Sequence, residues 1–128
     1  MKRDWDVVRE ILTKVESMDL HNQELSLKSF ETKTAQELFI ISGHMKLLIE
    51  RELVNGVMYS QLNIRLYIDE FSVKGLTWAG HEFLDSIRND TVWNKTKETF
   101  ATKGLDMTFE TIKAVAAAAM TAMLGLSA

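Results

Sequence analysis

The stretch NIRLYIDEFSVKGLTWAG, residues 63–80, decides the fold class, because the spacing of its apolar residues changes along its length. Residues 63–69 alternate apolar with polar side chains, the period of two that is typical of a half-buried strand. The segment FSVKGL repeats this alternation after the charged pair Asp69–Glu70, which predicts a hairpin with its turn at that pair. Thr77 then offers the hydroxyl of a helix N-cap. The stretch therefore predicts a hairpin that leads directly into a helix.

The helix that begins at Thr77 is expected to continue to about Ala101 and to end at Lys103–Gly104, since glycine accepts the left-handed backbone that closes many helices. It contains two tryptophans, Trp78 and Trp93. Both are interpreted as anchors that pack inside the domain rather than as surfaces that stack on a ligand. The segment is accordingly predicted to be chiefly scaffold.

The N-terminal part of the chain predicts a helix followed by a short strand. Residues 5–18 carry apolar side chains at spacings of three and four, the helical period, with Asp4 or Asp6 as the N-cap. Residues 25–30 then alternate leucine with polar side chains, which favours a strand. A turn is expected between the two.

Residues 34–53 return to helical spacing. Thr34 and Glu37 fit a capping box, in which each side chain satisfies a free amide of the first turn. The pair Asn55–Gly56 is expected to stop this helix. The pair Ser42–Gly43 leaves two alternatives open: one continuous helix, or a short helix, a turn and a longer helix.

Composition narrows the class of protein. A chain of 128 residues has the usual size of one domain, and it contains no cysteine, which excludes disulfides, thiolate metal sites and thiol nucleophiles. The formal net charge of -3 has the wrong sign for a protein that holds phosphates by bulk charge. The N-terminus alternates charged and apolar residues where a secretory signal has an unbroken apolar run. These features favour a cytoplasmic protein.

The predicted order of helix, strand, helix, helix, hairpin and helix is that of a winged helix. The segments MKRDWDVVREIL, GHMKLLIERELVNG and LTWAGHEFLDSIRNDTVWNKTK, with the ending FETIKAVAAAAMTAMLGL, resemble an uncharacterised winged-helix family. Its members are small proteins encoded by phages and prophages and classed as a domain of unknown function. The resemblance spans nearly the whole chain. It implies the fold and an origin in a bacterial host cell, and it brings no established reaction.

The expected fold class is therefore α+β. Residues 1–104 are predicted to form a winged helix-turn-helix domain, and residues 105–128 a C-terminal apolar helix that serves association. Asp106 or Thr108 is expected to cap this last helix, and Gly125 to end it.

The last helix is predicted to mediate self-association. Between Ala114 and Leu126 only Thr121 is polar, and a helix that is apolar almost all round needs a cover. The run is shorter than the roughly 20 residues that a bilayer requires, and it lacks the basic face of a membrane-surface helix. A homo-oligomer without membrane contact is expected. The candidate association residues are Ile112, Val115, Ala116, Ala119, Met120, Met123 and Leu124.

Nucleic-acid binding is the function that a winged helix invites, although a fold alone is a weak argument for a function. The second helix of the motif would enter the major groove and needs hydrogen-bond donors on its outer face. Residues 37–53 carry two basic against three acidic side chains, and residues 57–76 carry two of each. This balance disfavours contact with phosphates. The candidate nucleic-acid contacts are His44, Lys46, Arg51, Arg65 and Lys74.

Catalysis is not predicted. Glu82 and Asp85 lie one helical turn apart, but carboxylates so placed on a charged helix are usually a solvated pair. His21, His44 and His81 lie in three different predicted elements and show no metal-binding spacing. The chain has neither a glycine-rich phosphate loop nor a nucleophile elbow. We expect no catalytic residue, no cofactor and no metal ligand.

The leading interpretation is a non-catalytic phage or prophage accessory protein that acts through protein–protein contact, with a host or defence component as a candidate partner. The alternative is a DNA-binding transcriptional regulator of prophage genes. The acidic balance and the apolar tail favour the first, and the fold favours the second.

Overall fold

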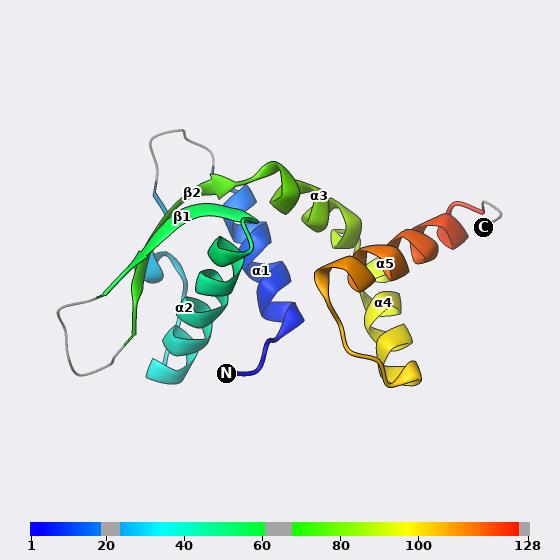
Figure 1. The fold of residues 1–128 in the computed structure, drawn as a ribbon, viewed down its shortest axis with the longest axis horizontal. Coiled ribbons are helices and arrows are strands. Elements are labelled where there is room, and N and C mark those ends of the chain that lie inside the picture. Colours follow the sequence, from blue (N-terminus) through cyan, green and yellow to red (C-terminus); the bar gives the residue numbers. More distant parts are fainter. Residues whose placement is uncertain (19–23, 61–67, 126–128) are drawn as a thin grey trace. The chain divides into compact units, whose positions relative to one another are not determined.

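The computed structural model describes residues 1–18, 24–60 and 68–125, which form helices and one two-stranded antiparallel sheet (Figure 1). The elements are α1 (Trp5–Glu16), the 3-10 helix η1 (Leu27–Ser29), α2 (Ala35–Glu50), β1 (Val54–Tyr59), β2 (Glu70–Leu76), α3 (Trp78–Ile87), α4 (Asp90–Lys103) and α5 (Phe109–Met123). The fold is α+β. The chain divides into two compact units, Met1–His81 and Glu82–Ala128, so the residue predicted as the domain boundary, 104, lies within the second unit.

Helix α1 follows its predicted pattern. The Asp4 carboxylate caps it by accepting hydrogen bonds from the backbone amides of Asp6 and Val7, at 3.0 and 3.3 Å. One face is buried and packs against α2 and β2. The buried residues of this face are Trp5, Val8, Ile11, Leu12 and Val15.

Helix α2 is continuous through Ser42–Gly43. The Thr34 hydroxyl accepts from the Glu37 amide at 3.1 Å, as predicted. The prediction that the Glu37 side chain binds an amide of the first turn is wrong, because its carboxylate accepts a hydrogen bond from the Lys33 amide, before the helix, at 2.7 Å. Among residues 24–60, η1 and the single helix α2 stand where the helix-turn-helix prediction has two helices, so that part of the prediction is not confirmed.

The hairpin is present with a different first strand. Val54 of β1 pairs with Leu76 of β2 and Tyr59 with Glu70, so Glu70 opens a strand and the predicted Asp69–Glu70 turn is wrong. Asn55–Gly56, predicted to end a helix, lies in β1. The predicted first strand, residues 63–69, falls mostly outside the described residues.

In place of the strand predicted at residues 25–30, the structure has a single β-bridge. Leu25 and Val73 exchange two backbone hydrogen bonds of 3.0 Å, and the chain then turns into η1. Phe30 stacks on Phe71 with ring centroids 5.9 Å apart. In the first unit the hairpin lies along α1 and α2, and buried side chains of these elements form the core (Figure 1). Its most deeply buried large side chains include Ile11, Leu12, Met45, Leu48, Phe71 and Val73.

The second unit contains the end of α3 with α4 and α5. The prediction of one helix from Thr77 to Ala101 is wrong, because Asn89 interrupts it and caps α4 by accepting from the Val92 amide at 3.0 Å. An asparagine side chain at that position competes with the helix for backbone amides. The predicted end of α4 is confirmed, since Gly104 has a φ of 64°.

Helix α5 packs against α4. Thr108 is its cap, with the hydroxyl accepting from the Thr111 amide at 3.1 Å. At the start of α5, Phe109 meets the buried Phe83 edge to face, with centroids 4.8 Å apart. Gly125 follows the helix with a φ of 73°, as its predicted role as a stop requires.

Candidate functional site

The predicted nucleic-acid contacts that lie among the described residues do not form one surface. His44 is only 1% exposed, and both of its ring nitrogens are occupied. The Asp4 amide can only donate, so Nε2 accepts from it at 2.8 Å, and Nδ1 donates to the Ile40 carbonyl at 2.7 Å. The prediction that His44 contacts a ligand is wrong. The prediction assumed that a polar residue of this helix faces the solvent, whereas the His44 ring is buried and links α2 to the start of α1.

The exposed cations are scattered. Lys46 and Arg51 lie five positions apart, which separates them by roughly 140° around the helix axis. Glu50 lies one turn beyond Lys46 on the same face and offsets its charge. Lys74 is exposed on β2, where the register shift between Asn55 and Gly56 leaves it out of the pairing. Arg65 lies outside the described residues.

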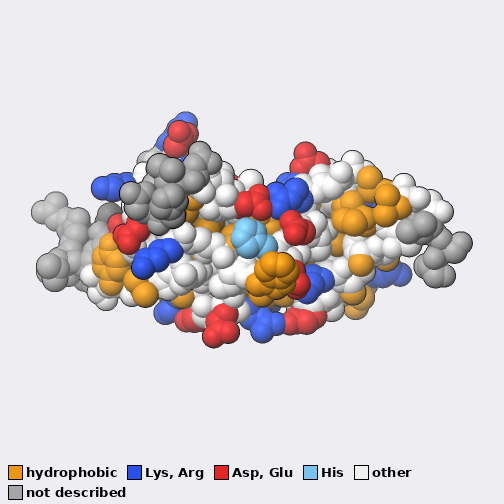
Figure 2. All heavy atoms as spheres, turned by 90° about the horizontal axis from the view of Figure 1, so that it is seen from above, with side chains coloured by type: hydrophobic (Ala, Val, Ile, Leu, Met, Phe, Trp, Pro, Cys, Tyr) orange, Lys and Arg blue, Asp and Glu red, His pale blue; other side chains and the backbone are white. Residues whose placement is uncertain are grey.

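The surface charge pattern agrees with this scatter. Figure 2 shows Lys and Arg side chains interspersed with Asp and Glu over one face of the described chain, rather than gathered in a block. Mixed charges of this kind give a weak field at phosphate distance, because opposite charges cancel within a Debye length.

The predicted association residues divide into two groups. Ile112 and Ala116 are fully buried, so they belong to the core of the second unit, and their assignment to an intermolecular contact does not fit the structure. Val115 and Ala119 are half-buried. The exposed remainder lies at the end of α5 and consists of Met120, Met123 and Leu124.

The two tryptophans of the predicted scaffold helix differ. Trp93 is 2% exposed in α4, as predicted, with the Lys97 ammonium 5.4 Å from its ring centroid. Trp78, at the first position of α3, is 79% exposed, so its prediction as a packing anchor is wrong. The error has a physical cause: helical spacing cannot say which face of the first turn meets the core.

Trp78 is held in position by a tight junction between β2 and α3. The Thr77 hydroxyl donates to the Glu52 carbonyl at 2.6 Å and accepts from the Gly80 amide at 3.1 Å. The Thr77 amide donates to the Leu53 carbonyl at 3.1 Å. A Cβ atom at Gly80 would overlap that Leu53 oxygen, so only glycine permits this approach. The junction fixes the start of α3 against the end of α2.

A hollow of about 450 Å³ lies at this junction. Its lining comes from the end of α2, the start of β1 and the start of α3. The lining residues are Ile49, Glu52, Val54, Asn55, Gly56, Thr77, Trp78 and Ala79. The lining thus includes one aromatic residue, Trp78, and one charged residue, Glu52, and the sequence did not predict the hollow because these two residues are 26 positions apart.

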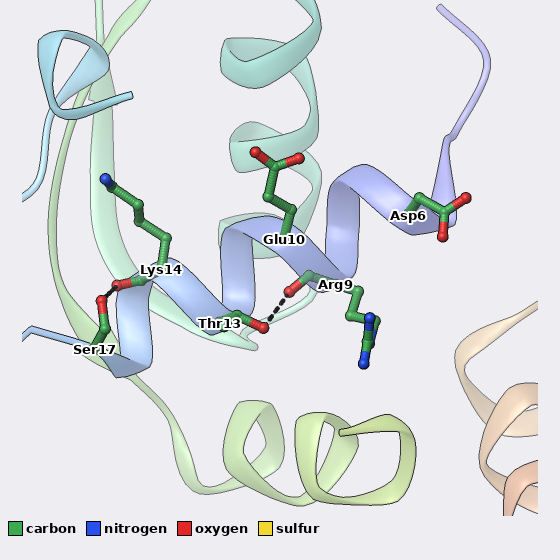
Figure 3. Close-up of a pocket in the computed structure, with 6 residues that line it drawn as sticks. All are labelled: Asp6, Arg9, Glu10, Thr13, Lys14 and Ser17. Atoms are coloured by element: carbon green, nitrogen blue, oxygen red, sulfur yellow. Dashed lines mark hydrogen bonds between the residues drawn. The ribbon is translucent and has the colours of Figure 1, made fainter. Parts of the chain in front are cut away.

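A second hollow, of about 500 Å³, lies along α1 (Figure 3). The charged residues that line it do not converge in Figure 3, and they comprise two acids and two bases. Its two hydroxyls are bound to the helix's own backbone, Thr13 to the Arg9 carbonyl at 2.8 Å and Ser17 to the Lys14 carbonyl at 2.7 Å. This arrangement presents neither a nucleophile with a base nor a convergent ligand set.

Residues 1–18, 24–60 and 68–125 contain no group of three His, Cys, Asp or Glu side chains arranged to hold a metal ion. The His81 Nδ1 atom lies 3.8 Å from a Glu16 carboxylate oxygen in an exposed pair. No helix in the described part of the chain is both long enough and apolar enough to span a bilayer. His21 lies outside the described residues.

The described residues define a small α+β protein whose first unit has a hollow beside an exposed tryptophan. The chain belongs to the hypothetical-protein family DUF2513, which matches residues 2–106. An uncharacterised protein of Haemophilus influenzae is 42% identical over 124 residues, covering 97% of this chain and 99% of the relative. No solved structure matches the chain.

Proposed function

We propose that this protein is a non-catalytic accessory protein of phage or prophage origin that acts in the bacterial cytoplasm through protein–protein contact. In this proposal its first unit is a variant of the winged helix, with α2 and the hairpin in the places of the recognition helix and the wing. The observation that carries the proposal is the exposure of Trp78 beside a hollow. Tryptophan is among the residues that most often dominate binding energy in protein interfaces.

A pull-down with the full chain as bait tests this proposal. We expect the full chain to recover a protein partner from a bacterial lysate. The recovery should persist after nuclease treatment and should be lost with the Trp78→Ala variant. Tyr59→Ala is the matched control, because Tyr59 is also an exposed aromatic of the first unit but lies outside the lining of the hollow. Recovery that disappears with nuclease would instead point to nucleic acid as the bridge.

Self-association through α5 is part of the proposal. Leu124 is 67% exposed and Met123 is exposed one residue before it, an apolar end that a second copy would cover. Deleting α5 is a poor test, since it would also remove the buried Ile112 and Ala116. We expect the wild-type chain to be a dimer or higher oligomer by light scattering, and Met123→Lys with Leu124→Lys to be a folded monomer. A wild-type monomer would overturn this part of the proposal.

The second candidate function is DNA binding as a regulator of prophage genes. It is favoured by the exposure of Lys46, Arg51 and Lys74 on α2 and the hairpin. Fluorescence anisotropy with random and genomic duplexes separates it from the first candidate. A sub-micromolar Kd at physiological salt, with a steep salt dependence that Lys46→Ala reduces, would reverse the ranking.

A further inference from the structure

The end of α2 contains a backbone feature that does not suit its residue. The Leu53 amide donates to the Leu48 carbonyl at 2.9 Å and the Glu52 amide to the Ile49 carbonyl at 3.0 Å. These two bonds form a Schellman motif, whose left-handed position is normally glycine. Here that position is Glu52, with a φ of 62°, the only non-glycine residue with a positive φ among the described residues.

The contacts of the Glu52 side chain do not explain why a glutamate occupies a position where glycine is usual. Only its backbone carbonyl is used, as the acceptor of the Thr77 hydroxyl. Within the described residues its carboxylate takes part in no hydrogen bond or ion pair, and the side chain is exposed. Residues held in an unfavourable backbone conformation cluster at functional sites. Glu52 thus occupies the junction at a cost in stability that no hydrogen bond or ion pair of its side chain within the described residues offsets.

The surroundings of this carboxylate define what it can bind. Glu52 is the one charged residue in the lining of the hollow, and Trp78 is its one aromatic residue. An indole face attracts a cation through the ring quadrupole, and a carboxylate pairs with the same cation. Both groups therefore favour a positive ligand.

We propose that the hollow between Trp78 and Glu52 binds an arginine side chain from a protein partner. This inference rests on the proposed function, since it names the chemistry that the partner presents. A guanidinium is planar, stacks on an aromatic face and donates two parallel hydrogen bonds to a carboxylate. Asn55 adds an exposed amide at the rim. The Thr77 and Gly80 contacts keep the hollow formed before the partner arrives.

Nuclear magnetic resonance on the full ¹⁵N-labelled chain tests the site with two defined probes. The probe is acetyl-Gly-Arg-Gly-amide, and its control carries citrulline, the neutral isostere of arginine. Trp78→Phe assigns the indole signal of Trp78. We expect the arginine peptide to shift that signal and the amides of Glu52 and Asn55, whereas the citrulline peptide leaves them in place. Equal shifts with both peptides, or shifts centred elsewhere, would overturn the proposal.

Two matched variants test the role of the charge. Glu52→Gln is expected to raise the Kd of the arginine peptide about three- to tenfold, the range for the loss of one exposed charge-assisted contact. Glu50→Gln removes the same charge from the same helix end but lies outside the lining, and the Kd should be unchanged. Equal weakening by both variants would show a general field effect and would overturn the site.

The same samples separate a failure of this site from a failure of the proposed function. A random duplex that binds below micromolar Kd at physiological salt contradicts the protein-contact function, whatever the peptides do. Absent peptide shifts together with weak duplex binding contradict the arginine site alone.

Discussion

The imidazole of His44 in α2 accepts a hydrogen bond from the backbone amide of Asp4 across 40 positions of sequence, at 2.8 Å. Asp4 is itself the cap of α1, so one side chain of α2 fixes the residue that begins α1. The other ring nitrogen donates to the Ile40 carbonyl at 2.7 Å. A buried, doubly bonded histidine of this kind aligns two helices and leaves no nitrogen for a ligand.

His44→Ala is therefore expected to destabilise the protein. The change leaves the Asp4 amide without its acceptor and opens a cavity at a site that is almost fully buried. We expect the free energy of unfolding to fall by about 2–4 kcal/mol, measured by urea denaturation. His81→Ala, at an exposed histidine, is the control and should change it by less than about 0.5 kcal/mol. Equal effects would contradict the bridging role.

Gly80→Ala tests the junction between β2 and α3. The new Cβ would meet the backbone oxygen of Leu53, and a backbone atom cannot move aside as a flexible side chain does. We expect a loss of about 1–3 kcal/mol with a matching drop in Tm, measured by circular dichroism. The control is Gly75→Ala, because a Cβ at Gly75 meets nothing within 4 Å. A Gly80→Ala variant as stable as Gly75→Ala would refute the close approach.

Glu52→Gly is expected to stabilise the protein. Glycine removes the left-handed strain of roughly 1–2 kcal/mol but adds freedom to the unfolded chain, which leaves a net gain of about 0.5–1 kcal/mol. Glu50→Gly, two residues earlier inside α2, should instead cost about 1 kcal/mol. Urea denaturation of both variants checks the difference in sign. A loss at position 52 would show that the glutamate side chain supports the fold after all.

Several helix caps and helix stops that are made by one residue were predicted from the sequence. Thr34 caps α2 as predicted, and Asp4 and Thr108 cap α1 and α5 where the sequence offered Asp4 or Asp6 and Asp106 or Thr108. Gly104 and Gly125 follow helix ends with positive φ. Each of these acts on backbone groups within four positions, so its effect does not depend on the rest of the chain.

Features that depend on distant partners were not predictable. Val54–Tyr59 is free to pair with β2 because α2 ends at Glu50, and the left-handed residue that follows this helix, Glu52, is not one of the usual signals of a helix stop. The position of His44 depends on its hydrogen bond with Asp4, and the hollow is lined by Glu52 and Trp78 from distant parts of the sequence. Asn89 is a local signal that was overlooked, since an asparagine within a helical pattern is also a good cap.

Truncation of the two tryptophans of residues 76–98 should affect the stability of the protein very differently. Trp93 is 2% exposed, so Trp93→Ala removes a large buried side chain and should lower the free energy of unfolding by about 3–5 kcal/mol. Trp78 is 79% exposed, so Trp78→Ala should change it by less than about 0.5 kcal/mol. Guanidinium denaturation followed by far-ultraviolet circular dichroism measures both without relying on indole fluorescence. If Trp78→Ala also unfolds the protein, the indole belongs to the core and the surface that we assign to binding does not exist.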